Sequence, residues 1–139
     1  MKTAFIAYIA AGVVFLAIDS VWLSIMADRF YRPLLGDRLM EGFSLAPAAI
    51  FYLIYIGGIV FFAILPALAS GGLAKAAING LALGLVAYAT YDLTNHATLR
   101  DWPVAISVVD IAWGTILTGL SASAGYLAAL CLREVLPSK

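Results

Sequence analysis

Charge is scarce in this sequence of 139 residues, because only 12% of the side chains belong to Asp, Glu, Lys or Arg. A water-soluble domain carries about a quarter charged residues, so the composition excludes an ordinary soluble domain. Acidic and basic residues are equal in number, with eight of each. No basic excess is present to hold a nucleic-acid backbone, and we expect no nucleic acid among the partners.

Cysteine and histidine are also nearly absent. Cys131 is the single cysteine, which excludes an intrachain disulfide and a cysteine-based metal site. The signatures H-E-x-x-H and G-x-S-x-G, which mark metalloproteases and serine hydrolases, do not occur. The sequence therefore identifies no cofactor and assigns no metal ligands, and it leaves open whether the protein is an enzyme.

Apolar residues fill most of the chain and make up 64% of it. Charges and turn residues divide them into four runs, at about 3–26, 47–68, 73–95 and 104–132. Each run has the roughly 20 residues that a helix needs to cross a bilayer, and lipid cannot satisfy free backbone groups. We predict an all-α integral membrane protein: a compact bundle of four transmembrane helices forming one domain over 1–139, with its termini on the same side. The lysines and arginines divide equally between the two sides, which leaves the orientation open.

Three aspartates interrupt these apolar runs: Asp19, Asp92 and Asp110. A charged side chain near the middle of a bilayer costs at least about 2.5–3.5 kcal/mol on insertion scales. Because successive spans run in opposite directions, all three aspartates fall in the half of the membrane opposite to the termini. We expect them to point inward into one cavity, where a proton, a cation or water must offset their mutual repulsion.

Aromatic and polar residues flank each aspartate at helical spacing. Residues three and four positions apart share a helix face, so Trp22 lies beside Asp19 and Trp113 beside Asp110. The same spacing places Tyr88, Asn95 and His96 beside Asp92. The candidate ligand-binding set is Asp19, Trp22, Tyr88, Asp92, Asn95, His96, Asp110 and Trp113. Trp102, at the edge of a span, is instead expected in the aromatic belt of the membrane interface.

Small residues predict where the helices approach one another closely. Gly80 and Gly84 form a G-x-x-x-G pair in the third run. The fourth run carries small residues on one face, namely Ser107, Gly114, Thr118, Ser121 and Gly125. Such spacing lets helix backbones come into contact in lipid, so it predicts packing and says nothing about activity.

Several longer segments carry a resemblance to a known family. They are YATYDLTNHATLRDWP at 88–103, FLAIDSVWL at 15–23, FYRPLLG at 30–36 and VDIAWGT at 109–115. Together they resemble a family of bacterial membrane proteins called domain of unknown function 2177, over essentially the whole chain. The resemblance implies a four-helix, multi-pass protein of the bacterial cytoplasmic (inner) membrane. It implies no activity.

Three functions remain open on these observations. Clustered carboxylates with aromatic walls suit the binding or transport of a small cationic or proton-coupled ligand, and transport through four helices would favour a homodimer. A membrane-embedded enzyme, with or without a bound metal, could act on a lipid or isoprenoid substrate. In the third case the protein is a structural or accessory subunit in which the aspartates only hold helices together. The expected partners are therefore the lipid bilayer and a small ligand or lipid.

Overall fold

The computed structural model describes residues 2–40 and 42–135, with side chains as far as Leu132. All regular structure in this part of the chain is helical. Four helical stretches are long and apolar enough to cross a membrane: the one that begins with α1 (Lys2–Met26), Leu45–Ala69, α5 (Gly72–Thr98) and α6 (Val104–Val135). The prediction of an all-α protein with four transmembrane helices is therefore confirmed.

Two of the stretches contain irregular turns. After α1 come a π-helix, η1 (Ala27–Tyr31), the short α2 (Arg32–Leu35) and a 3₁₀ turn, η2 (Gly36–Arg38). The second span is α3 (Leu45–Gly58), a π-helix, η3 (Ile59–Ile64), and α4 (Leu65–Ala69).

Pro66 in α4 explains part of this irregularity. It has no backbone N–H to donate to the carbonyl of Phe62 one turn earlier. The side chain of Asn79 donates to that carbonyl instead, with 3.3 Å between Nδ2 and the oxygen. A neighbouring helix thus satisfies a backbone group that lipid would leave unpaired.

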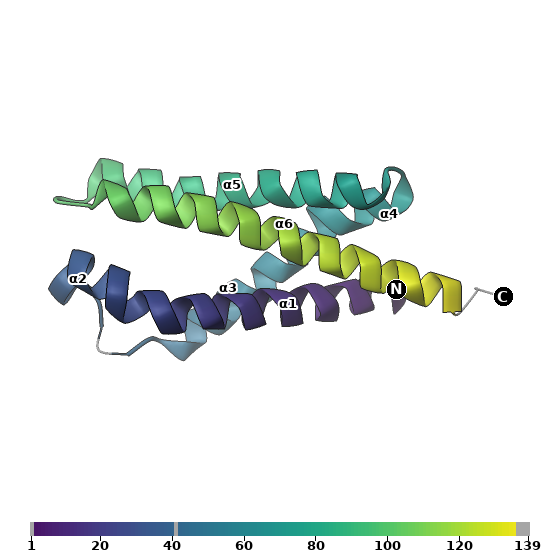
Figure 1. The fold of residues 1–139 in the computed structure, drawn as a ribbon, viewed down its shortest axis with the longest axis horizontal. Helices are drawn as coiled ribbons and strands as arrows, with labels where there is room; N and C mark the ends of the chain where they lie inside the picture. Colours follow the sequence, from purple (N-terminus) through teal and green to yellow (C-terminus); the bar gives the residue numbers. More distant parts are fainter. Residues whose placement is uncertain (1, 41, 136–139) are drawn as a thin grey trace.

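The four spans are not parallel, and this gives the bundle two different ends. Figure 1 shows the second span running diagonally, from beside α1 at its start to beside α5 at its end. The helix α6 packs along α5 and also against α1. At the end that carries α2, the α1–α3 side of the bundle therefore separates from the α5–α6 pair (Figure 1).

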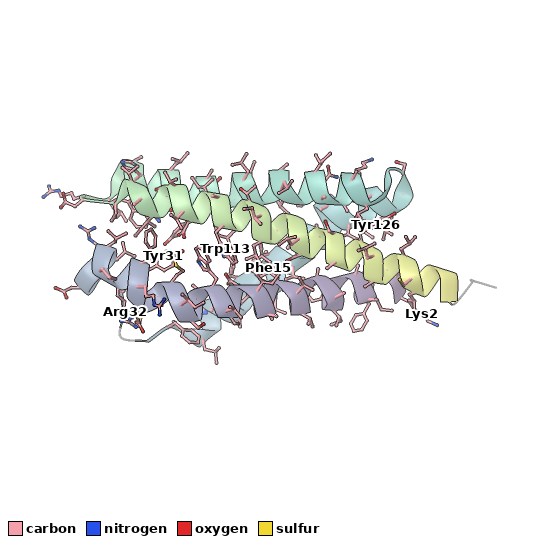
Figure 2. The ribbon with its side chains drawn as sticks, in the orientation of Figure 1. Lys2, Phe15, Tyr31, Arg32, Trp113 and Tyr126 are labelled. Carbon is pink, nitrogen blue, oxygen red and sulfur yellow. The ribbon has the colours of Figure 1, made fainter. Side chains whose placement is uncertain are left out.

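The apolar core lies where the spans cross. Phe15 of α1, Ile59 of η3 and Leu117 of α6 are each fully buried there. Figure 2 shows Phe15 near the middle of the bundle. The phenol of Tyr55 reaches the same region and shares a hydrogen bond of 2.9 Å with the hydroxyl of Thr118. The apolar core therefore does not extend to the separated end of the bundle, where polar and aromatic side chains lie.

Glycines bring α5 and α6 into backbone contact, as the sequence predicts. A Cβ atom on Gly84 would lie 2.5 Å from the carbonyl oxygen of Gly114 and 2.8 Å from the hydroxyl of Thr118. A Cβ on Gly80 would lie 2.7 Å from that of Ala122. Because real Cβ atoms do not approach this closely, only glycine fits at these two positions.

Gly125 makes a similar contact between α6 and α1 near the other end of the bundle. A Cβ atom there would lie 2.9 Å from the carbonyl oxygen of Ala7 and 3.0 Å from the Cβ of Ala11. The start of α1, marked by Lys2 in Figure 2, and the last turns of α6 lie at this end. That the two termini share one side of a membrane stays a prediction.

The glycine contacts generate a test of the packing. Gly84→Ile should lower the thermal stability of the purified protein by about 1–3 kcal/mol, the usual cost of overpacking, because the added side chain meets backbone atoms of α6. Ala82→Ile is the matched control, since Ala82 is exposed on the same helix. Thermal unfolding in detergent measures both, and equal melting temperatures would contradict the packing described.

Candidate functional site

The separated end of the bundle encloses a cavity of about 580 Å³. It lies between α1, residues 27–40 and 42–43, α5 and α6. Figure 2 shows Tyr31 and Trp113 in the space between α1 and α6. Among the described residues, the cavity wall has the charged side chains of Asp19, Arg32 and Asp110, and its aromatic side chains include Trp22, Tyr31, Tyr88, Tyr91, Trp102 and Trp113.

Asp19 holds three spans together at the inner part of this cavity. Its side chain is only 8% exposed. The hydroxyl of Tyr52 on α3 donates to Oδ2 at 2.9 Å, and the indole Nε1 of Trp113 on α6 donates to Oδ1 at 3.3 Å. Both carboxylate oxygens are thus satisfied by neighbouring helices, as a buried polar group requires.

Asp110 is reached through a second set of hydrogen bonds. The hydroxyl of Tyr31 donates to Oδ1 of Asp110. The same phenol oxygen accepts a hydrogen bond of 3.2 Å from the indole of Trp22. No described residue donates to the other carboxylate oxygen, Oδ2, so this oxygen keeps its capacity to accept.

Two stacked indoles connect the two aspartates. The rings of Trp22 and Trp113 have centroids 4.0 Å apart and planes inclined by 10°. Trp22 bonds through Tyr31 to Asp110, while Trp113 bonds directly to Asp19. One continuous chain of contacts therefore joins both carboxylates across α1, η1 and α6.

Tyr31 contacts both Trp22 and Asp110, although it is not in the candidate set. Nine residues separate it from Trp22, and nine residues make about two and a half turns of a regular α-helix. The two side chains would then point to opposite faces. The wider π turn of η1 changes this rotation and lets Tyr31 reach Trp22 and Asp110. The only signal in the sequence was its position in the segment 30–36 that carries the family resemblance.

Five of the eight residues predicted for the site line the cavity: Asp19, Trp22, Tyr88, Asp110 and Trp113. Asn95 and His96 do not line it. They lie in the last turns of α5, where Asn95 is half-buried and His96 is exposed. Trp102, expected at the membrane interface, does line the cavity and donates a hydrogen bond of 3.0 Å to Ser107.

Asp92 is buried but lies outside the cavity lining. Its side chain has no exposed surface, and neither carboxylate oxygen has a hydrogen-bond partner among the described residues. Gly84 lies against Gly114, so about two turns further along α5 the antiparallel register brings Asp92 to the level of Ile106 and Ser107. The close packing of α5 on α6 therefore determines the position of Asp92, which does not share the cavity with Asp19 and Asp110.

A smaller cavity of about 310 Å³ adjoins the first between α3 and α5. Phe51 and Tyr55 line it from α3, and it shares Tyr88, Tyr91 and Asp110 with the larger cavity. Asp110 therefore faces open space on two sides.

Metal ligation was a further possibility for the acidic residues. Among the side chains described within residues 2–40 and 42–132, no three His, Cys, Asp or Glu lie close enough together to hold one metal ion. The arrangement instead pairs two separate carboxylates with aromatic walls.

A protein-family model described as predicted membrane protein (DUF2177) matches residues 4–127. No curated protein and no solved structure matches the chain. The matched residues include all of the cavity residues named above and most of the four membrane-spanning stretches. The chain belongs to the DUF2177 family of predicted membrane proteins.

Proposed function

We propose that the cavity binds a small organic cation. The observation that carries this proposal is that two carboxylates, Asp19 and Asp110, open on one cavity whose walls are aromatic rings. Aromatic faces and carboxylates are the groups that recognise organic ammonium ions, because both attract positive charge. The volume of about 580 Å³ also falls within the usual range for small-molecule sites.

The charge balance of the cavity supports a cationic ligand over an anionic one. Arg32 is the basic residue on its wall, and its Nε forms an ion pair of 2.8 Å with Asp28. Asp19 and Asp110 have no such ion pair among the described residues. A carboxylate inside a membrane span is costly unless a counter-charge is supplied, and a bound cation would supply it.

The two aspartates are suited to different roles. Both oxygens of Asp19 accept hydrogen bonds from other helices, which favours a structural clasp. Asp110 keeps one oxygen without a donor and faces both cavities. We therefore assign the direct contact with the cation to Asp110 and the positioning of the indoles to Asp19. In the alternative function, a structural subunit, the aspartates only hold helices together. The hydrogen bonds of Asp19 are the one observation that favours this alternative.

Transport and location are further parts of the proposal. Four helices rarely enclose a pathway alone, so transport would require a homodimer, whereas binding would not. The family to which the chain belongs is described as a membrane protein, and the resemblance noted in the sequence supports the bacterial cytoplasmic membrane as its location.

Binding of choline tests the proposal against its uncharged isostere, 3,3-dimethyl-1-butanol. In lipid nanodiscs, choline should bind at least about tenfold more tightly, because only choline carries the charge that Asp110 and the rings attract. The fluorescence of the indoles in the cavity or calorimetry gives the affinities. Equal affinities for the two compounds would refute a cation site.

Amide variants separate the two aspartates. Asp110→Asn should keep the melting temperature and weaken choline binding at least about tenfold. Asp19→Asn should lower the melting temperature, because an amide nitrogen cannot accept the hydrogen bond from Tyr52 or Trp113. Asp37→Asn, which removes an exposed carboxylate outside the cavity, is the control. Unchanged choline affinity in Asp110→Asn would show that Asp110 does not hold the cation.

The hydrogen bonds of Tyr31 generate a separate prediction. Tyr31→Phe removes the hydroxyl that ties η1 to Asp110 and Trp22. Amide hydrogen exchange should then rise in residues 27–38 and stay unchanged in the α5–α6 contact, because the lost tether is local. Tyr91→Phe, on the same cavity, serves as control. Equal exchange in both variants would mean that Tyr31 does not anchor this segment.

A further inference from the structure

We propose that the ligand is an amphiphile, whose cationic head lies in the cavity and whose hydrocarbon chain lies in a groove between α1 and α6. This inference rests on the proposed cation site and names the class of molecule that the site takes. It is carried by a second hollow of about 510 Å³ beside the cavity. We call this hollow the α1–α6 groove and define it by Ala17, Ile18, Val21, Ile25 and Met26 of α1 together with Trp22 and Trp113.

The lining of the groove is suited to a hydrocarbon chain. Apart from the two indoles, all of its side chains are aliphatic or a thioether. Val21 is 60% exposed and Ile25 is 47% exposed, so the groove is open along the side of the protein that faces lipid. A chain can therefore enter from the bilayer without leaving an apolar environment.

The groove adjoins the acidic cavity, because Trp22 and Trp113 line both. The polar edge of each indole is directed towards the cavity: Trp22 donates to Tyr31, and Trp113 donates to Asp19. An indole presents one polar N–H and an otherwise apolar ring. The stacked pair thus forms a boundary with hydrogen-bonding groups on one side and apolar surface on the other.

This boundary is what distinguishes the groove from ordinary lipid-facing surface. Any apolar hollow in a membrane protein contacts lipid chains, which needs no specific ligand. Here the hollow ends at two indoles whose other side faces a cavity with two carboxylates, so a molecule with a cationic head and one chain would satisfy both regions at once. The smaller cavity between α3 and α5 is less suited to a hydrocarbon chain, because phenols and Asp110 line it.

Alkyltrimethylammonium ions of increasing chain length test the inference in nanodiscs. Tetramethylammonium reports on the head site alone, and hexyl- and decyltrimethylammonium add the chain. After correction for partition into the lipid, affinity should still rise with chain length, because the chain then gains packing contacts with the side chains of the groove. Filling the groove should remove most of this gain and leave tetramethylammonium binding unchanged.

The chain offers a matched pair of variants for this purpose. Val21→Trp fills the groove, whereas Val13→Trp places the same side chain on the same helix outside it, and Val13 and Val21 are equally exposed, at 62% and 60%. We expect at least a tenfold loss of decyltrimethylammonium affinity in Val21→Trp and none in Val13→Trp. Ala17→Phe, also in the groove, repeats the test should Val21→Trp fail to fold.

The outcomes separate the two proposals. The groove would be overturned if affinity rose equally with chain length in Val13→Trp and in the groove variants. Binding of tetramethylammonium would still support the cation site in that case. The groove would also be overturned if affinity did not rise with chain length in the unaltered protein. Absence of tetramethylammonium and decyltrimethylammonium binding in the unaltered protein would overturn the cation site and the groove together.

Discussion

The architecture of this protein depends on how it accommodates the buried carboxylate of Asp19 in an apolar helix. Such a carboxylate is tolerated only when neighbouring groups satisfy it, and here the partners come from two other helices, as Tyr52 of α3 and Trp113 of α6. These two hydrogen bonds fix the level at which three spans meet. They also fix the ring of Trp113, and through the stack the ring of Trp22. The same hydrogen bonds that satisfy Asp19 therefore also fix part of the cavity wall.

The two halves of the bundle are packed in different ways. In one half, glycines at positions such as Gly80 and Gly125 bring helix backbones into contact, which supplies the dispersion energy that holds helices together in lipid. In the other half the spans separate, and bulky aromatic side chains surround a cavity without filling it. There the hydrogen bonds of Asp19 connect the spans in place of close backbone contact.

Much of this could be predicted from the sequence, because the membrane imposes strong rules. Span length and backbone satisfaction determine four helices, and the depth of Asp19 and Asp110 follows from counting along antiparallel spans. Trp22 and Trp113 follow from helical spacing. The positions of Asn95 and His96 could not be judged in the same way, since a residue at the end of a span shares a helix face with the site without reaching it.

Helical spacing alone does not give the direction of every side chain. Tyr31 joins the cavity because a π turn alters the rotation of the chain, and no residue pattern in η1 announces that turn. Asp92 is fully buried outside the cavity lining, on the helix whose glycines bring it into contact with α6. Depth can be counted from a sequence, whereas rotation about the helix axis depends on packing between helices.

The contact of Gly125 with α1 has a mechanical consequence for the opposite end of α6. A screw movement of this helix by one residue, which combines a slide of about 1.5 Å with a turn of about 100°, would carry Ala124 or Tyr126 towards the carbonyl of Ala7, where even a single added carbon does not fit. This contact therefore opposes any change of register between α6 and α1. Asp110 and Trp113 lie on the same helix, so the contact holds both at one height relative to α1, and a ligand of the proposed class would find them already in place.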